Sequence, residues 1–307
     1  MHYSKWQFSV TNDLDATDNT ILFQEDFFRY SSLLGTTPTL NEKLTACTSV
    51  FLNRPYQYDP LGDGEFGDID RRPLINTKQF DCFSFCNIVL AMINGETPED
   101  ALENLKIIRY GSSPTRYFNR FHFVESQWNT ANRKEGFIKN VTASVFDASQ
   151  LHSFNLRINL PKWATFQNKY LTKKFSARSP HQPLPIPPYF SRPVDVNIDY
   201  VSLDTLLAGS PYIIEKIPEG TICQLVCKDW DLATKIGTQI AICHLGIITK
   251  SNQTLYFNQA EINAHVMRVP LDQYLHLSRK HHPHITGIRL ESIQPNTRPI
   301  DNTQKVF

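Results

Sequence analysis

Hydrophobic residues recur at helical spacing in the first part of the chain. Two rows each fall on one face of a helix, and Thr97 followed by Pro98 is a typical start for the second helix. We therefore expect a mostly helical part over about 36–150. The first row is Leu40, Leu44, Cys47 and Phe51, and the second is Ala101, Leu102, Leu105 and Ile108.

The pattern changes after a proline-rich stretch between Ser179 and Pro193, which predicts an extended loop or insertion over about 176–195. The part that follows, about 196–295, contains short runs that are typical of β-strands. Helices followed by strands predict an α+β fold, and we treat 1–307 as a single domain. The expected strands are Thr221–Cys227, Gln239–Thr249, Thr254–Asn258, Ala264–Val269 and Thr286–Leu290.

The segment after Asp81 predicts a buried helix with two adjacent apolar rows. Asp81 is a good N-cap, and Asn94-Gly95 is a good C-terminal stop. Cys82 therefore lies in the first turn, where free N–H groups and the helix dipole favour a thiolate. The two rows are Phe85, Val89 and Met92, and Cys86, Leu90 and Ile93.

His244 is a polar ring in the otherwise apolar strand Gln239–Thr249, so it needs a partner. A first-turn cysteine and a histidine delivered by a strand form the nucleophile and base of papain-like enzymes. Asn258 lies on the next expected strand, where antiparallel pairing sets its amide beside the imidazole. Each residue also has a structural alternative: Cys82 as a core thiol, His244 as a satisfied core histidine and Asn258 as a turn residue.

Composition narrows the function classes. The chain has 307 residues, and 31 basic against 30 acidic side chains give a net charge of +1, so no global field attracts nucleic acid. The longest apolar run, Ile88–Ile93, is too short to cross a bilayer, and the N-terminus shows no basic segment followed by an apolar stretch. We expect a soluble chain with no nucleic-acid partner, no integral membrane contact and no visible export signal.

Six cysteines are too few for a disulfide scaffold at this length and leave the redox compartment open. The pairs Cys82/Cys86 and Cys223/Cys227 have a spacing that occurs in zinc sites. The first pair lies in a helix of core residues and the second in a strand, so core thiols are the simpler interpretation. We expect no metal and no cofactor.

Several short segments, taken in their order along the chain, resemble one known family. They cover roughly 40–145 and 200–292. The segments are Asn53-Arg54-Pro55-Tyr56, Phe80-Asp81-Cys82-Phe83-Ser84-Phe85, Ile108-Arg109-Tyr110, Tyr117, Arg120-Phe121-His122-Phe123, Trp128, Asn132, Gly136, Cys243-His244-Leu245-Gly246-Ile247 and Leu255 to Asn258. Together they are similar to the N-acetylmuramoyl-L-alanine amidase-like family of NlpC-type papain-like cell-wall cysteine hydrolases.

The resemblance implies roles for individual residues. Cys82 is then the nucleophile and His244 the general base and acid, while Asn258 stands where related enzymes more often carry a second histidine. Tyr56 matches an aromatic hydroxyl that helps bind the oxyanion, with a core tyrosine as the alternative. The substrate-binding residues that it implies are Asp81, Arg120, His122 and Trp128.

Two of these residues have a stated chemistry: Arg120 pairs with a stem-peptide carboxylate, and Trp128 stacks on a sugar unless it is simply core. The sequence departs from the family pattern at two further places. Gly220-Thr221 replaces the usual Gly-Asp, and Cys243 precedes His244 where serine is common. These departures bear on substrate details more than on the nucleophile.

The implied function is a cysteine amidohydrolase of bacterial peptidoglycan, on a papain-like core, that cleaves the N-acetylmuramoyl-L-alanine amide. The alternatives are a γ-D-glutamyl stem-peptide endopeptidase, a secreted protein-directed amidase or deamidase, and a catalytically silent peptidoglycan-binding module. A peptidoglycan or muropeptide substrate implies the periplasm, the cell envelope or secretion, which contrasts with the absence of a visible signal peptide.

Overall fold

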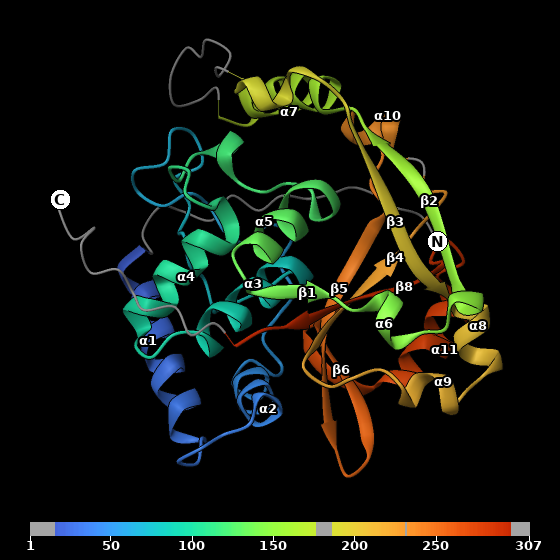
Figure 1. The fold of residues 1–307 in the computed structure, drawn as a ribbon. Helices are drawn as coiled ribbons and strands as arrows, with labels where there is room; N and C mark the ends of the chain where they lie inside the picture. The colour runs from blue at the N-terminus through green and yellow to red at the C-terminus, as the bar shows by residue number, and fades with distance from the viewer. Residues whose placement is uncertain (1–15, 176–185, 231, 296–307) are drawn as a thin grey trace.

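The computed structural model describes residues 16–175, 186–230 and 232–295, and its centre is an eight-stranded sheet (Figure 1). Neighbouring strands pair antiparallel in the order β2-β3-β8-β4-β5-β6-β7, and β1 pairs with β8. The strands are β1 (Ile138–Asn140), β2 (Leu151–Ile158), β3 (Val194–Ser202), β4 (Thr221–Val226), β5 (Ile242–Ser251), β6 (Thr254–Ala260), β7 (Val266–Pro270) and β8 (Gly287–Ile293).

Helices cover both faces of the sheet (Figure 1). Helices α1 to α5 lie on one face, α6, α8, α9 and α11 lie on the other, and a buried apolar cluster fills the space on each side. The helices are α1 (Ala16–Ser32), α2 (Leu40–Val50), α3 (Cys82–Ile93), α4 (Pro98–Tyr110), α5 (Asn129–Lys134), α6 (Thr142–Val145), α7 (Leu160–Phe175), α8 (Leu203–Ala208), α9 (Tyr212–Glu215), α10 (Ala233–Ile236) and α11 (Leu271–His281), with short turns η1 (Tyr117–Asn119), η2 (Val124–Trp128), η3 (Ala148–Gln150) and η4 (Pro188–Ser191).

Helix α3 is the helix predicted after Asp81, and the structure confirms its start and its end. The Ser84 N–H donates to the Asp81 carboxylate at 2.7 Å, and the Asp81 N–H donates to Ser84 Oγ at 2.9 Å, which closes a capping box. Every residue from Ser84 to Ile93 is buried, because α3 contacts α2 and α4 as well as β5 and β6. This burial holds Cys82 in a fixed position.

The α+β class is confirmed, as are α2, α4 and the five expected strands, although strand ends differ by up to three residues. The sequence analysis missed α1, α7 and strands β1, β2 and β3. Strands β2 and β3 pair along their length and form an arm that rises from the sheet toward α7 (Figure 1). Part of the predicted proline-rich insertion, 176–185, lies outside the described residues.

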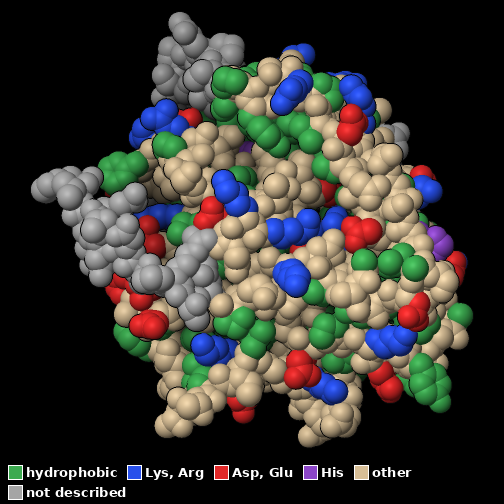
Figure 2. Space-filling model, viewed as in Figure 1, with side chains coloured by type: hydrophobic (Ala, Val, Ile, Leu, Met, Phe, Trp, Pro, Cys, Tyr) green, Lys and Arg blue, Asp and Glu red, His purple; other side chains and the backbone are tan. Residues whose placement is uncertain are grey.

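No helix in the described ranges combines the length and the apolarity needed to span a membrane. Basic and acidic side chains are interspersed on the face drawn in Figure 2, and that surface is hollowed beneath α7.

Candidate active site

The Cys82 sulfur lies at the start of α3, against strand β5. The backbone N–H groups of Leu245, Phe83 and Cys82 itself lie near it and favour its thiolate form, and Leu245 is the direct neighbour of His244. Burial raises the pKa of Cys82 to about 12, and the Asp81 carboxylate adds to the shift, while the three N–H groups oppose it. A thiolate at this position therefore needs a cation beside it.

His244 is held by a side chain from the next strand. Its Nε2 atom lies 2.5 Å from Gln259 Oε1, and Gln259 Nε2 donates a hydrogen bond of 2.8 Å to the Glu261 carboxylate. Burial lowers the pKa of His244, whereas the charge of Glu261 and the hydrogen bond to Gln259 act in the opposite direction. Burial therefore disfavours an isolated charge on Cys82 and on His244 alike.

The structure shows that Asn258 does not orient His244, so this prediction is wrong. Asn258 is buried, and its Nδ2 donates to Ile247 O and to Thr249 Oγ1, each at 2.9 Å. Gln259, the next residue, contacts the His244 ring instead.

The register of the β5–β6 hairpin explains the difference. Ser251 pairs with Thr254 around the two-residue turn Asn252–Gln253, in which both residues have positive φ. Because side chains alternate between the two faces of a sheet, this pairing puts the odd-numbered residues of β6 on the face of His244. The length of this turn fixes the register, and the register places Gln259 on the face of His244.

Tyr56 reaches the same site through contacts that are distant in sequence. It forms a bridge with Phe80, and its backbone N–H donates to Ala264 O at 3.0 Å. Burial raises the pKa of Tyr56, and the nearby charges of Asp81 and Cys82 add to the shift. The structure thus brings a protonated hydroxyl, which can donate a hydrogen bond, into the environment of Cys82. Its oxyanion role stays a prediction.

Asp81 has a structural role, and its predicted substrate contact stays a prediction. One carboxylate oxygen accepts from Ser84 N–H, and the other accepts from Asp59 N–H at 3.0 Å. The side chain therefore caps α3 and fixes the preceding loop. Both of its oxygens are already bonded within the protein.

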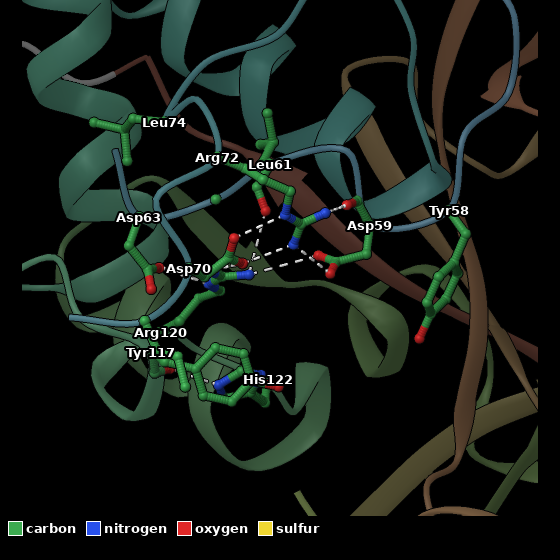
Figure 3. Close-up of polar contacts among 12 residues, drawn as sticks. Tyr58, Asp59, Leu61, Asp63, Asp70, Arg72, Leu74, Tyr117, Arg120 and His122 are labelled. Carbon is green, nitrogen blue, oxygen red and sulfur yellow. Dashed lines mark hydrogen bonds and ion pairs between the residues drawn. The ribbon is translucent and has the colours of Figure 1, made fainter. Parts of the chain in front are cut away.

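The prediction that Arg120 binds a substrate carboxylate is wrong. Arg120 is only 6% exposed, and its guanidinium forms ion pairs with Asp63 at 2.5 Å and with Asp70 at 2.9 Å. Figure 3 shows Arg120 and Arg72 among the carboxylates of Asp59, Asp63 and Asp70. Since its charge is matched inside the protein, Arg120 ties the loop 59–72 to the body of the protein.

His122 and Trp128 are also engaged in structural contacts. His122 Nε2 lies 2.7 Å from Tyr117 O, the ring packs against Trp163, and burial lowers the pKa of His122 to about 3. Trp128 is fully buried, and its Nε1 donates to Asn87 Oδ1 at 2.7 Å. An indole without exposed surface cannot stack on a sugar, so that prediction is wrong and the core alternative holds.

A disulfide, which the sequence analysis did not predict, joins Cys227 at the end of β4 to Cys243, the residue before His244. Cys227, Cys243 and His284 place their ligand atoms within 4.8 Å of one another, and they are the metal-ligand cluster found in the described parts of the chain. The two sulfurs are bonded to each other, so they do not serve as thiolate ligands in this structure. Cys82, Cys86 and Cys223 are free thiols.

Comparison with known proteins supports the sequence resemblance. The profile of the AmiA-like family, described as N-acetylmuramoyl-L-alanine amidase-like, matches residues 46–282. The chain belongs to this family. The matched range contains Tyr56, Cys82, His244 and Gln259, so the family architecture includes the whole candidate site.

Solved structures confirm the fold of helices and antiparallel sheet. A protein from Legionella pneumophila is 25% identical, with 92% of this chain and 97% of that chain covered and a TM-score of 0.77. An N-acetylmuramoyl-L-alanine amidase from Bacteroides uniformis is 21% identical, with 83% of this chain and 99% of that chain covered and a TM-score of 0.58. No match is found among curated proteins.

Proposed function

We propose that this protein is a cysteine amidohydrolase of peptidoglycan that cleaves the amide between N-acetylmuramic acid and L-alanine. The observation that carries the proposal is the position of Cys82 at the start of a buried helix, beside the strand end that carries His244 with its partner Gln259. A nucleophile helix packed on an antiparallel sheet is the expected papain-like arrangement. Membership of the amidase-like family supports the substrate class.

In the proposed reaction His244 accepts the proton of the Cys82 thiol, and the thiolate attacks the amide carbonyl. Gln259 accepts a hydrogen bond from Nε2 of the ring, so Nδ1 is the nitrogen that receives the thiol proton. The imidazolium and the thiolate stabilise each other in a setting where burial disfavours each charge alone.

The tetrahedral intermediate carries a negative oxygen that needs hydrogen-bond donors. The Cys82 backbone N–H at the start of α3 and the protonated Tyr56 hydroxyl are the donors we assign to it. His244 then protonates the amine of L-alanine as the C–N bond breaks, which leaves the lactyl group of muramic acid as a thioester on Cys82. A water molecule, deprotonated by His244, hydrolyses this thioester and restores the free thiol.

We further propose that the protein acts in the cell envelope or outside the cell, where peptidoglycan is found. The disulfide Cys227–Cys243 supports this location, because disulfides persist in oxidising compartments.

The test is digestion of purified peptidoglycan and of defined muropeptides, with mass spectrometry of the products. We expect free stem peptides that begin with L-alanine, and Cys82→Ala should reduce their rate of formation at least about a thousandfold. Cys86→Ala is the matched control, since Cys86 lies one turn further along α3 and is fully buried. It should retain activity in the folded protein.

Other products would identify the alternatives. Cleavage within the stem peptide would keep the mechanism and change the bond to a γ-D-glutamyl linkage. If no product forms while muropeptides still bind to both the parent protein and Cys82→Ala, the chain is a binding module. If neither cleavage nor binding is seen, the peptidoglycan proposal is wrong and protein amides become the substrates to test.

A further inference from the structure

A continuous chain of hydrogen bonds runs from His244 on β5 through Gln259 on β6 to Glu261, which follows the last residue of β6. His244 Nε2 contacts Gln259 Oε1 at 2.5 Å, and Gln259 Nε2 donates to Glu261 Oε2 at 2.8 Å. Gln259 is fully buried, whereas Glu261 is half-buried and lines a surface hollow beside Tyr274 and His282. The chain therefore connects the imidazole to a carboxylate at the protein surface.

The chemistry of a carboxylate restricts the amide between them. A carboxylate oxygen accepts hydrogen bonds and cannot donate them, so Glu261 requires the NH₂ end of the Gln259 side chain. The carbonyl end of the same amide must then face His244, and a carbonyl can only accept. The Nε2 atom of His244 must therefore carry a proton, which leaves Nδ1 with its lone pair in the neutral ring.

The reversed amide would give the opposite result. With Gln259 turned over, its carbonyl would face the Glu261 carboxylate, so two acceptors would meet without a proton between them. Its NH₂ group would face His244 and favour the tautomer protonated at Nδ1. That tautomer has no lone pair at Nδ1 with which to accept a thiol proton.

We propose that Glu261 is a positioning residue that fixes the tautomer of His244 through the side-chain amide of Gln259. Its catalytic consequence rests on the proposed function, but the tautomer itself does not. Glu261 touches neither the nucleophile nor the reacting atoms in this scheme. It acts by fixing the orientation of the Gln259 side-chain amide.

The other groups around His244 do not supply this constraint. The centroid of the Phe257 ring lies 6.0 Å from that of the His244 ring, and Phe257 offers no hydrogen-bond acceptor. The centroid of the Tyr274 ring, on α11, lies 6.4 Å from that of the His244 ring. His282, at the end of α11, carries a charge of the wrong sign when it is protonated, and it opposes the protonation of His244. Glu261 is the anion in the described surroundings that favours the imidazolium.

The proposal is tested by ¹⁵N nuclear magnetic resonance of the histidine rings in the intact protein at a pH where His244 is neutral. The ten histidines are resolved by comparison with His244→Gln, which removes one pair of signals. We expect a protonated Nε2 and an unprotonated Nδ1 in the parent protein. Glu261→Gln, which can donate to the reversed amide, should give a mixture of tautomers and an about tenfold lower kcat/KM on muropeptides.

A swapped variant separates this effect from simple damage to the fold. In Gln259→Glu/Glu261→Gln the carboxylate faces His244 directly and the amide donates to it, so the Nε2-protonated tautomer should return and kcat/KM should recover to within about threefold. Glu219→Gln is the control for loss of a charge. Glu219 is exposed and lies just before the start of β4, whereas the Leu225–His244 pair lies near the end of that strand. It should change neither readout.

Two results would overturn the proposal: a single unchanged tautomer in Glu261→Gln, or a mixture of tautomers that persists in the swapped variant. Both results are measured from the ¹⁵N signals of the His244 ring, in the absence of substrate. If the protein cleaves no muropeptide but the tautomers respond as described, the proposed function fails while the positioning role of Glu261 stands.

Discussion

Replacing Arg120 by methionine tests whether this residue belongs to the substrate site or to the scaffold. Methionine has a similar length and no charge, so Arg120→Met leaves two buried carboxylates without their shared cation. Among the described residues, Asp63 then keeps the hydrogen bond from the Tyr110 hydroxyl at 2.6 Å, and Asp70 keeps Arg72 at 2.6 Å. Removing one partner of a buried ion pair costs about 3–5 kcal/mol of unfolding free energy. We expect a loss in this range at pH 7.5.

The loss should depend on pH in a direction that the burial predicts. Burial already raises the pKa of Asp63 in the parent protein, and Arg120 opposes that shift. Without Arg120 the pKa rises further, so the folded protein binds a proton that the unfolded chain releases. A group whose folded pKa is raised gains stability as the pH falls through that pKa. Arg120→Met should therefore recover part of its loss between pH 7.5 and pH 5.

Urea unfolding followed by tryptophan fluorescence measures both effects, with muropeptide KM measured in parallel. Arg157→Met is the control, because the Arg157–Asp195 pair is exposed by about two thirds on each side and should contribute at most about 1 kcal/mol. A loss below about 1 kcal/mol for Arg120→Met, together with a raised KM, would refute the structural assignment and return Arg120 to the substrate site.

Two further predictions concern the strand that carries His244. The Cβ added in Gly246→Ala would lie 2.3 Å from the Phe257 ring, so this variant should lose at least about 1–3 kcal/mol of stability and some activity, whereas Gly35→Ala, where the added atom meets nothing within 4 Å, should lose neither. Breaking the disulfide in Cys227→Ser/Cys243→Ser should cost about 3 kcal/mol, since it closes a loop of 16 residues. Dithiothreitol should lower the thermal midpoint of the parent protein to that of the variant and leave the midpoint of the variant unchanged. An unaffected parent protein would contradict the disulfide.

Local signals explain which parts of the fold could be predicted from the sequence. The helix at Cys82 has strong apolar periodicity, a good N-cap and a good stop, and its ends were correct. Strands β2 and β3 were missed, because β2 is largely exposed along its length and its partner lies beyond the proline-rich segment. Pairing between distant segments leaves little trace in either segment alone.

The site was predictable to the extent that its chemistry is local. Cys82 and His244 were singled out because a first-turn cysteine and a polar ring in an apolar strand are unusual positions, and the structure confirms both positions. Gln259 was missed because strand β6 was ended at Asn258, two residues before its end at Ala260. An error of one residue in a strand moves a side chain to the opposite face of the sheet, so finding the residue that contacts His244 required the register as well as the motif.

The segments that carry the family resemblance are mostly those that hold Cys82 in place. Asp81 caps the helix of Cys82, and Trp128 binds Asn87 on the same helix. Arg120 ties the loop preceding that helix to the body of the protein through buried ion pairs. A resemblance of this kind identifies an enzyme scaffold with high specificity, because buried polar contacts tolerate few substitutions. It assigns substrate contacts poorly for the same reason: Arg120 and Trp128 are buried and bonded within the protein, so a ligand does not reach them.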